Sequence, residues 1–485
     1  MRIIMASRES DWRREAENSV LLKAVSHWRE EPERWFQGSY DRLPETVRVN
    51  PMSEEKVWVE SWLSGIGANR IPWFSGPGSA WEMPFDRGSA QEEVKSLMAA
   101  LHETGRITRQ EAVSMLPVLA LDPTPGQIVL DLCASPGSKT TQICEHLGDS
   151  GAVIANEVIS GRVNTLVTNV QRHASRTVLV VQHDGRHIPK VPGSGFDGVL
   201  VDVPCTGSGT TRKNPDVWGK WRPSAGRSLH SLQYDLLSRA IAVTKPGGRV
   251  VYSTCSLDPI ENEAVVARVV AGGKVRVIPC GDSLAGVPCK PGMTNWPLLN
   301  DIGELDGVSK SEEYLLPMKE KAVSSQLNDC LRIWNDEIGG GGFFLAVLER
   351  IQEEDVSRVI DPFPSQKTFD DPEAFPQPID EKRERELREV WGSVPSNMWS
   401  RGKSLLWSSD EIRKIWGADR TRKSGRELIP GGRWRPLRVI HLGLIAARLR
   451  KGVLDRTVSR AARRLRGEIS GPFVNVDERV IDDIL

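Results

Sequence analysis

The stretch IVLDLCASPGSKTTQICEHLG, residues 128–148, combines three local patterns in a fixed order. Its first apolar run predicts a strand that is buried on both faces. The small residues at 134–138 predict a tight loop, and the pattern after Lys139 predicts a helix. A loop between a strand and a helix presents backbone N–H groups that can bind a polar or anionic ligand. The stretch therefore predicts the first strand–loop–helix unit of an α/β domain.

The same alternation of apolar runs and helical stretches continues as far as residue 350. Continuous Val, Ile and Leu runs are typical of strands in a covered parallel sheet, so the alternation predicts a doubly wound α/β domain over residues 126–350. The ligand crevice of such a sheet lies at the carboxyl ends of its strands. The further predicted strands are AVIANE (152–157), TVLVVQHD (177–184), FDGVLVD (196–202), GGRVVYSTC (247–255), KVRVI (274–278) and GGFFLAVLE (341–349).

Composition divides the rest of the chain into three regions. Residues 1–125 mix helical patterns, near residues 17–29 and from Gln91, with a strand-like run at 46–49, which predicts a mixed α+β region. Residues 351–388 are acidic and rich in proline, and such a segment is typical of a linker. The remaining residues, 389–485, are expected to form a small basic accessory domain.

Basic residues are concentrated near the C-terminus, although the formal net charge of the chain is zero. Residues 401–470 contain 19 Lys and Arg against 6 Asp and Glu. This asymmetry is typical of a region that faces nucleic acid. A solvated helix surface is an equally weighted alternative, because ARLRKGVLDRTVSRAARRLRGE (447–468) has the pattern of an amphipathic helix with its arginines outside.

The bulk composition excludes several classes of protein. Hydrophobic residues make up 39% of the chain and charged residues 26%, which is typical of a soluble globular protein, and no apolar run is long enough to span a bilayer. Seven cysteines without paired spacing predict no disulfide framework, and the lack of a Cys-x-x-Cys pair predicts no zinc site. The mixed charges of residues 1–18 argue against a secretory signal, so we expect a reducing compartment.

Acidic residues follow three of the predicted strands: Glu157, Asp184 and Asp202. A carboxylate after the second strand can accept hydrogen bonds from ribose hydroxyls, and one after the third can meet an adenine amino group. The loop lacks both Walker A and G-x-G-x-x-G spacing, so a nucleoside with a short charged tail, such as S-adenosylmethionine (AdoMet), fits better than a nucleotide or dinucleotide. Each carboxylate alone is more simply a helix cap, but together with the loop they favour the ligand.

Two cysteines follow neighbouring predicted strands: Cys205 in DVPCTG and Cys255 in STCS. Both stand among small and polar residues at strand exits, where functional residues concentrate, and either alone is as compatible with an inert thiol. A thiolate that adds to C6 of cytosine makes C5 nucleophilic toward a sulfonium methyl group, and a second cysteine can assist product release. Asp202 could accept from the cytosine amino group or N3–H.

Activation of such a thiol requires a lowered pKa. Lys139, Arg212 and Lys213 are the candidate cations that would stabilise the thiolate.

These motifs resemble those of the Sun-domain family of RNA 5-methylcytosine methyltransferases, especially its tRNA-modifying branch. DLCASPGSKTTQ resembles the cofactor loop of that family, DVPCTGSGTTRKNPDVWGKW its fourth motif and VVYSTCSLDPIENEAVV its sixth. The resemblance covers about residues 35–350, and SNMWSR and RPLRVIHLGLIAARL resemble its C-terminal PUA-like region. It implies a Rossmann-like class I AdoMet-dependent methyltransferase domain over residues 126–350, an RNA-binding region over 1–125 and a PUA-like domain over 389–485.

The resemblance also implies a role for each motif residue. Cys255 would be the nucleophile, Cys205 would promote product release and Asp202 would lie beside the methyl donor. Glu157 would bind the ribose of AdoMet and Asp184 its adenine. The loop residues that would hold AdoMet are Cys133, Ala134, Ser135, Pro136, Gly137, Ser138 and Lys139. Ser135 and Ser208 depart from the family pattern, which has Ala at the first position and often Asp at the second.

The predicted function is methylation of cytosine C5 in RNA, with tRNA as the leading substrate. The alternatives are action on rRNA or mRNA, an RNA-binding protein that keeps the fold without turnover, and methylation of a protein or small molecule. We expect RNA as a partner, no membrane and no metal, in the nucleus, possibly the nucleolus, or the cytoplasm. No pattern indicates an oligomeric state.

Overall fold

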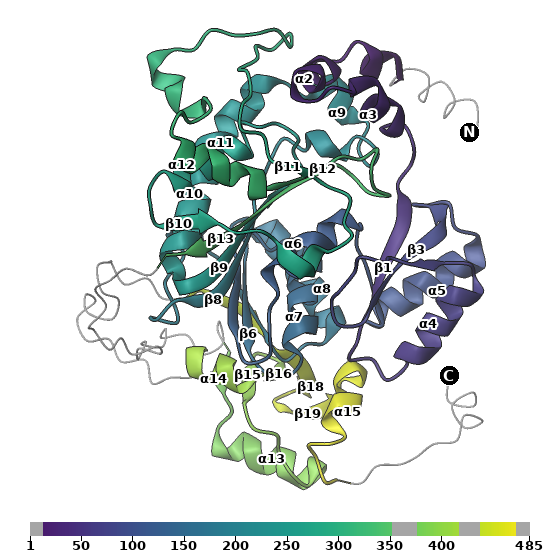
Figure 1. Cartoon of the computed structure of the whole chain (residues 1–485). Coiled ribbons are helices and arrows are strands. Elements are labelled where there is room, and N and C mark those ends of the chain that lie inside the picture. Colours follow the sequence, from purple (N-terminus) through teal and green to yellow (C-terminus); the bar gives the residue numbers. More distant parts are fainter. Residues whose placement is uncertain (1–12, 352–375, 417–436, 472–485) are drawn as a thin grey trace.

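The computed structural model describes residues 13–351, 376–416 and 437–471 (Figure 1). These residues form a central sheet of ten strands, a four-stranded sheet near the N-terminus and a five-stranded sheet near the C-terminus. Within the described ranges, no helix has both the length and the apolar character needed to cross a membrane.

The centre of the large sheet is parallel and has the order β9-β8-β5-β6-β7. These strands confirm the doubly wound α/β prediction; they are β5 (Ile128–Asp131), β6 (Ala152–Asn156), β7 (Val178–Val181), β8 (Phe196–Asp202) and β9 (Thr244–Thr254). β13 (Phe343–Arg350) pairs antiparallel with β9, so the sheet is mixed. The short strands β10 (Val275–Val277), β11 (Lys290–Pro291) and β12 (Leu331–Ile333) extend this side.

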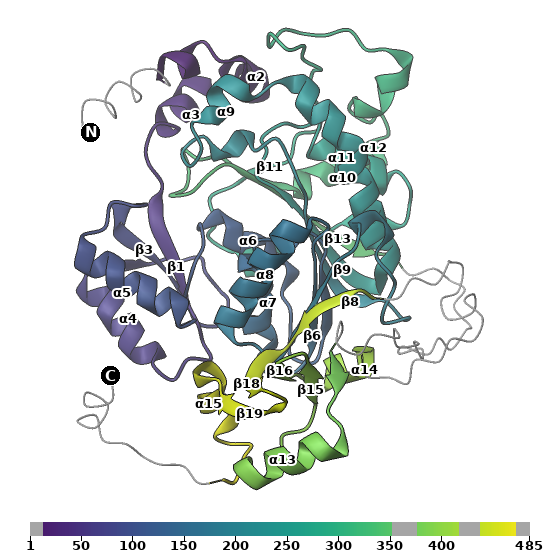
Figure 2. The same ribbon diagram turned by 180° about the vertical axis from the view of Figure 1, so that it is seen from behind.

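Helices cover both faces of the central sheet because alternate strand residues point to opposite faces. In β5, Val129 belongs to the core beneath α6 (Leu116–Leu121), α7 (Ser138–Leu147) and α8 (Ser160–His173). Its neighbours Ile128 and Leu130 belong to the opposite core, which packs against α10 (Pro223–Val243) and α11 (Glu263–Val270). Figure 2 shows α7 and α8 in front of the strands. The helix α12 (Lys321–Ser324) lies near α11.

The N-terminal region has its own antiparallel sheet in the order β2-β3-β1-β4. Its strands are β1 (Pro44–Val49), β2 (Asn69–Arg70), β3 (Ser79–Asp86) and β4 (Ile107–Arg109), packed against α4 (Lys56–Gly65) and α5 (Glu92–Glu103). The preceding α2 (Val20–Trp28) and α3 (Pro32–Gly38) pack on α9 (Asp216–Lys220) and the residue after it through tryptophans. The helical and strand-like patterns expected near residues 17–29, 46–49 and 91 are therefore all present.

The C-terminal region forms a sheet in the order β14-β15-β16-β18-β19. Its strands are β14 (Gln377–Pro378), β15 (Met398–Arg401), β16 (Ser404–Trp407), β18 (Leu444–Arg450) and β19 (Val453–Thr457), with helices α13 (Glu381–Trp391), α14 (Asp410–Trp416) and α15 (Ser459–Leu465). The division expected between residues 388 and 389 falls inside α13. Most of the linker expected over residues 351–388 lies outside the described residues.

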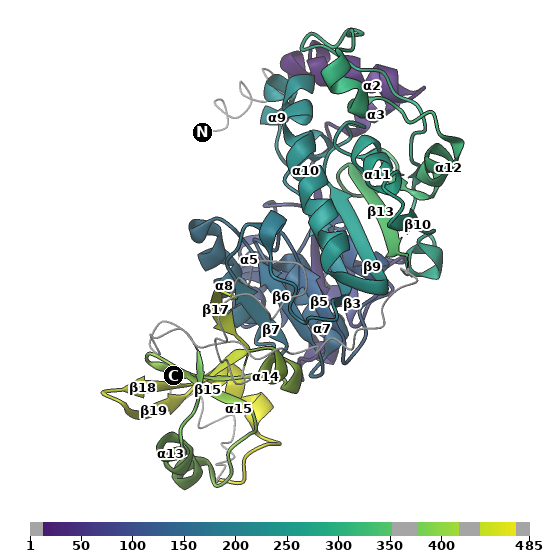
Figure 3. The ribbon, with the colours of Figure 1, turned by 90° about the vertical axis from the view of Figure 1, so that its left-hand side faces the viewer.

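One strand of the C-terminal region belongs to the central sheet. β17 (Val439–Leu442) pairs antiparallel with β7 and covers that edge of the parallel strands (Figure 3). Val439 and Leu442 are fully buried in the core on the α10 side. The C-terminal region is thus joined to the α/β domain by a shared sheet.

The prediction of an amphipathic helix over residues 447–468 was wrong for the first half of this stretch. Those residues form the β18–β19 hairpin, and the helix α15 begins only at Ser459. Lys451 and Gly452 both have positive φ, 51° and 79°, which is the conformation of a two-residue hairpin turn. The spacing of the apolar residues in this stretch fits a helix, but the turn at Lys451 and Gly452 divides the stretch into two paired strands.

Candidate active site

The cofactor-loop residues connect the end of β5 to the beginning of α7. Gly137, at the N-cap of α7, has a φ of +111°, and a Cβ there would lie 2.9 Å from Cδ1 of Leu166. Both facts require glycine at this position. The side chain of Asn156 donates to the carbonyls of Leu132 and His183, so the exits of β5, β6 and β7 are tied together. The loop is therefore held rigidly at the carboxyl edge of the sheet.

Asp131, the last residue of β5, had no role in the sequence-based prediction but lies buried beneath this loop. Its Oδ2 accepts a hydrogen bond from Oγ1 of Thr140 at 2.7 Å, whereas Oδ1 is buried and has no partner among the described residues. Burial raises the pKa of Asp131 to about 7, assisted by the negative charge of Asp202. The only signal in the sequence was an acidic residue directly before the loop.

Asp202 ends β8 and holds the ammonium group of Lys139. Nζ of Lys139 donates to Oδ2 of Asp202 at 2.8 Å and to Ser114, and Ser253 donates to Oδ1 of Asp202 at 2.7 Å. Burial alone would lower the pKa of Lys139, but Asp202 outweighs burial and the pKa is raised, with Asp131 and Cys255 acting in the same direction. Lys139 is therefore a fixed positive charge close to Cys255.

Cys205 and Cys255 lie side by side, with their Sγ atoms 3.2 Å apart and no disulfide between them. They follow adjacent strands, β8 and β9, as the sequence predicted. The hydrogen bond to Cys255 is the largest of several factors that raise the pKa of Cys205 well above its usual range; burial and the charge of Glu261 add to it. Cys205 therefore keeps its proton at neutral pH and can donate it toward the sulfur of Cys255.

A buried carboxylate, Glu261, connects the two cysteine loops and was not identified from the sequence. Its Oε1 accepts from the backbone N–H of Thr206 at 2.9 Å and from Gln233 at 3.0 Å, and its Oε2 accepts from the hydroxyls of Thr206 and Ser256. Thr206 follows Cys205 and Ser256 follows Cys255. Burial raises the pKa of Glu261, and these hydrogen bonds partly counter that effect.

Ser208, one of the two departures from the family pattern, is fully buried in the same network. Its hydroxyl accepts from the backbone N–H of Leu257 at 2.7 Å and lies 3.0 Å from the hydroxyl of Ser256. The hydroxyl of Ser208 therefore has hydrogen-bond partners at this buried position, and it supports the loop that carries Cys255.

A cavity of about 370 Å³ lies between these residues and the N-terminal sheet. Cys255 and Asp202 line it, and the N-terminal wall includes parts of β1 and β4. Among the predicted loop residues, Pro136, Gly137, Ser138 and Lys139 also line it. The predicted residues that do not line it are Cys133, Ala134, Ser135, Glu157, Asp184 and Cys205. The cavity thus brings together one of the two thiols, Asp202 and the second half of the loop.

Glu157 and Asp184 stand at the ends of β6 and β7 but both have protein partners. Glu157 accepts from the backbone N–H of Ile159 at 2.9 Å, and Asp184 accepts from that of Arg186 at 3.0 Å. The Arg186 side chain also pairs with Asp184 at 2.7 Å, and this hydrogen bonding is the main reason that the pKa of Asp184 is lowered. Both carboxylates therefore cap the backbone that follows them.

The three candidate cations have different surroundings. Lys139 lies near Cys255, and Lys213 lines the cavity. Arg212 instead donates to backbone carbonyls of the segment after α3 and of the loop before β13, including those of Asp41 and Gly340. Arg212 therefore joins the N-terminal region to the α/β domain.

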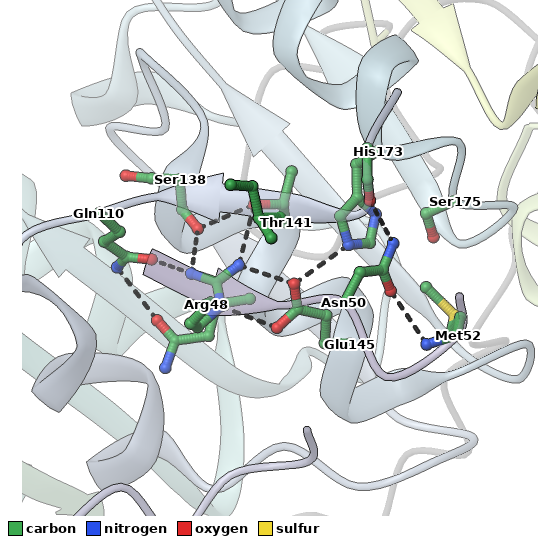
Figure 4. Close-up of polar contacts among 12 residues, drawn as sticks. Arg48, Asn50, Met52, Gln110, Ser138, Thr141, Glu145, His173 and Ser175 are labelled. Carbon is green, nitrogen blue, oxygen red and sulfur yellow. Dashed lines mark hydrogen bonds and ion pairs between the residues drawn. The ribbon is translucent and has the colours of Figure 1, made fainter. Parts of the chain in front are cut away.

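A buried ion pair joins the N-terminal sheet to the helix that follows the cofactor loop (Figure 4). The guanidinium of Arg48, on β1, makes two hydrogen bonds of 2.8 Å to Glu145 on α7 and also donates to the carbonyl of Ser138 at 3.2 Å. His173, on α8, contacts the same carboxylate at 3.2 Å. Burial alone would raise the pKa of Glu145, but Arg48 and His173 lower it to about 2.

Comparison with known proteins identifies relatives over most of this chain. A family model described as 16S rRNA methyltransferase RsmB/F matches residues 118–283. The multisite-specific tRNA:(cytosine-C(5))-methyltransferase of Saccharomyces cerevisiae is 36% identical over 314 residues, 58% of this chain and 45% of that protein. Ribosomal RNA small subunit methyltransferase F of Escherichia coli is 32% identical over 358 residues, 71% of this chain and 66% of that protein.

The solved structures include a similar chain, a methyltransferase homolog protein from Pyrococcus horikoshii. It is 28% identical with a TM-score of 0.51, and the match covers 68% of this chain and 93% of that one. The chain spans about half the length of the tRNA methyltransferases from Saccharomyces cerevisiae and Drosophila melanogaster that it matches.

Proposed function

The chain belongs to the 16S rRNA methyltransferase RsmB/F family, and from that membership we propose that it is an AdoMet-dependent RNA cytosine-C5 methyltransferase. The observation that carries the proposal is the pair of thiols, whose sulfurs are 3.2 Å apart. Cys255 lines a cavity with Asp202 and Lys139, which is where a flipped-out base would be needed. Methylation at C5 requires a nucleophile that adds to C6. Of the two cysteines, Cys255 lines this cavity and Cys205 does not.

The donor groups around the loop fit AdoMet. The turn at Gly137 places the N-terminus of α7 at the loop, and the first N–H groups of a helix are available to a ligand. We propose that Glu157 binds the ribose, that Asp184 binds the adenine after Arg186 moves aside, and that Asp202 lies beside the methyl donor. The loop residues from Cys133 to Lys139 would hold the remainder. When bound, AdoMet supplies an electrophilic methyl group.

The residues of the chain would act in sequence on the base. The thiolate of Cys255 forms a bond to C6 of cytosine, and electron density moves to C5, which then takes the methyl group. Asp202 accepts a hydrogen bond from the cytosine amino group or N3–H and stabilises the adduct. Loss of the C5 proton to a base restores the double bond and breaks the Sγ–C6 bond. Cys205, in contact with Cys255, assists this release.

We propose tRNA as the substrate because several of the relatives are named as tRNA methyltransferases. Ribosomal RNA is the alternative, since relatives from Escherichia coli are named for it. Residues 1–125 would bind and position the RNA, and residues 389–485 would act as a PUA-like accessory domain. The nuclear or cytoplasmic location remains a prediction from the composition.

Methyl transfer from labelled AdoMet to an unmodified tRNA transcript tests the proposal. We expect Cys255→Ala to reduce the rate by at least about 1000-fold, because the covalent route to C5 is lost. Cys205→Ala should instead accumulate an RNA–protein adduct that survives denaturing electrophoresis. A fully active Cys255→Ala enzyme would contradict the proposal.

Two further variants complete this test. Cys205→Ala combined with Cys255→Ala should abolish the adduct, which identifies Cys255 as the attached residue. Cys289→Ala, at a partly buried cysteine outside the cavity, should behave as the wild type. RNA binding without any methyl transfer by the wild type would favour an RNA-binding protein that has lost turnover.

A further inference from the structure

Three arginines of the C-terminal sheet lie in one row across four strands. Arg401 on β15 is directly opposite Ser404 on β16, Ser404 is opposite Arg448 on β18, and Arg448 is opposite Arg456 on β19. Directly opposite residues of antiparallel strands point to the same face of the sheet. Arg401, Arg448 and Arg456, called here the arginine row, therefore share one face over roughly 14 Å, three strand spacings.

The arginine row is an unfavourable arrangement for the isolated protein. Like charges directly opposite each other on neighbouring strands destabilise a sheet, and Arg448 and Arg456 are such a pair. None of the three guanidinium groups forms an ion pair with a carboxylate of residues 13–351, 376–416 or 437–471; Arg448 donates to the hydroxyl of Ser404 instead. Burial without a compensating charge lowers the pKa of Arg401. An anion from outside the described chain would relieve this repulsion.

Two adjoining cavities of about 350 and 370 Å³ lie over the arginine row. They share Gln171, Ile445 and Arg448 in their linings, so they form one groove. α8 is the opposite wall, and it presents Asn164, Val167 and Gln171, whose spacing of three and four residues places them on one helix face. No carboxylate lines either cavity in the described part of the chain. The charged side chains that line the groove are therefore all cationic.

The groove lies next to a larger cavity that adjoins the candidate active site. The first of its two cavities, of about 350 Å³, shares Ala174, Ser459 and Arg460 with a third cavity of about 630 Å³ between α15 and the N-terminal region. That third cavity shares Gly105 and His173 with the cavity that contains Cys255. Shared lining residues thus place these cavities around the C-terminal end of α8, and Gly105 packs against Arg172 and His173 between the last two.

We propose that the groove between the arginine row and α8 binds the phosphate backbone of the RNA substrate, away from the base that is methylated. The guanidinium group is the side chain best matched to phosphate, because its planar donors can bind two phosphate oxygens at once. A polyanion bound at the cavity of Cys255 that extends around the C-terminal end of α8 would neutralise the row. This inference rests on the proposed function for the identity of the polyanion.

The chain itself contains an alternative occupant, the acidic residues 352–375. The position of the row beside α8, the helix that also lines the cavity of Cys255, favours RNA, since the substrate must extend beyond that cavity. The test distinguishes the two, because removal of the arginine row weakens RNA binding if RNA is the ligand. It would strengthen RNA binding if the acidic segment competes for the groove.

The inference is tested by equilibrium binding of an unmodified tRNA transcript to the full chain without AdoMet. Binding is measured by fluorescence anisotropy over a series of KCl concentrations. For Arg448→Gln combined with Arg456→Gln we expect Kd to rise by about 10-fold. The slope of log K against log salt should fall in magnitude by about 1.4 to 1.8, the change for two lost phosphate contacts. Arg385→Gln, at an exposed arginine of α13 that lines none of the four cavities, is the matched control and should change neither.

Thermal unfolding without RNA separates this role from a structural one. Because repulsion is removed, the double variant should keep or raise its Tm while it loses RNA affinity. The single variant Arg456→Gln, at an exposed position, provides the same test with less perturbation. Its salt slope should change by about half as much as that of the double variant.

Several outcomes would overturn the inference. An unchanged Kd and salt slope would exclude a phosphate contact at the row. Tighter RNA binding by the variants, together with loss of binding to a synthetic peptide of residues 352–375, would identify the acidic segment as the occupant. Failure of this inference and failure of the proposed function give different results. A wild-type chain that transfers no methyl group but binds RNA through the row would contradict only the proposed function. An active enzyme whose RNA affinity does not depend on the row would contradict only this inference.

Discussion

Glu261 illustrates how a single buried residue can organise a reactive pair without contact with either sulfur. One carboxylate accepts four hydrogen bonds, from the residue after each cysteine and from Gln233. Five residues lie between Cys255 and Glu261 in the sequence, and no periodic pattern indicates that the chain turns back to bring them together. Its role depends on the loop conformation rather than on the motif.

Glu261→Gln should lower kcat with little change in the KM for RNA, because Glu261 supports the cysteine loops but does not line the cavity. The amide retains only one acceptor oxygen, so donors on one side lose their partner, at a cost of about 1–3 kcal/mol in the free energy of unfolding. Steady-state kinetics and urea unfolding measure both effects. Glu349→Gln, in a partly exposed ion pair, is the control. An unchanged kcat would exclude a positioning role.

At the scale of secondary structure, the Arg48–Glu145 pair joins β1 to α7. Both side chains are fully buried or nearly so, and Arg48 also reaches the carbonyl of Ser138 in the cofactor loop. The N-terminal sheet and the loop are therefore connected by a single guanidinium group. A buried pair of this kind contributes little net stability but is costly to break, since the remaining charge stays buried.

Arg48→Met should destabilise the protein by about 3–5 kcal/mol, measured by urea unfolding at pH 7. Replacement of both partners by Met should recover part of this loss, because no unpaired charge remains. A loss below about 1 kcal/mol in the single variant would show that the pair does not hold the two elements together.

The same ion pair predicts a dependence of stability on acid pH. The pKa of Glu145 is about 2 in the folded protein and 4.5 in its ordinary state, so above pH 4.5 the group is ionised in both states and the pair stabilises fully. Between pH 4.5 and about 2 only the unfolded chain takes up the proton, and stability falls with pH. In Arg48→Met the contribution of Glu145 to this dependence should be lost or reversed, because only His173 then opposes the effect of burial on the carboxylate. Urea midpoints at several pH values measure it, and identical profiles would contradict the assignment.

At the scale of the whole molecule, β17 makes the C-terminal region part of the cooperative α/β unit. It covers the β7 edge, which would otherwise expose unpaired backbone groups. The helix α15 adds further connections, because Arg463 pairs with Glu55 of the N-terminal region and Arg464 with Asp149. The three regions are therefore linked at more than one place.

Leu442→Ala should destabilise the α/β domain by about 2–5 kcal/mol, because Leu442 is fully buried in its core. Hydrogen exchange should show faster exchange of the β7 amides. Leu465→Ala, in the separate core of the C-terminal sheet, should leave those amides protected. Equal protection of β7 in wild type and Leu442→Ala would show that β17 does not stabilise this edge.

Local patterns were sufficient to predict the central architecture. The strands from β5 to β9, the cofactor loop and the positions of Cys205 and Cys255 could be predicted because buried strands, small loop residues and reactive thiols leave signals within a few residues. The expectation that the two thiols meet followed from the rule that parallel strands present their carboxyl ends at one edge.

Tertiary structure alone decided which distant residues are partners. The pairing of β17 with β7, the contact of Arg48 with Glu145 and the cross-strand row of arginines join segments whose order along the chain carries no information about their register. Hydrogen bonds between strands and buried charge pairs depend on three-dimensional proximity. The free energy that favours these pairings is therefore gained only when the distant segments come together during folding.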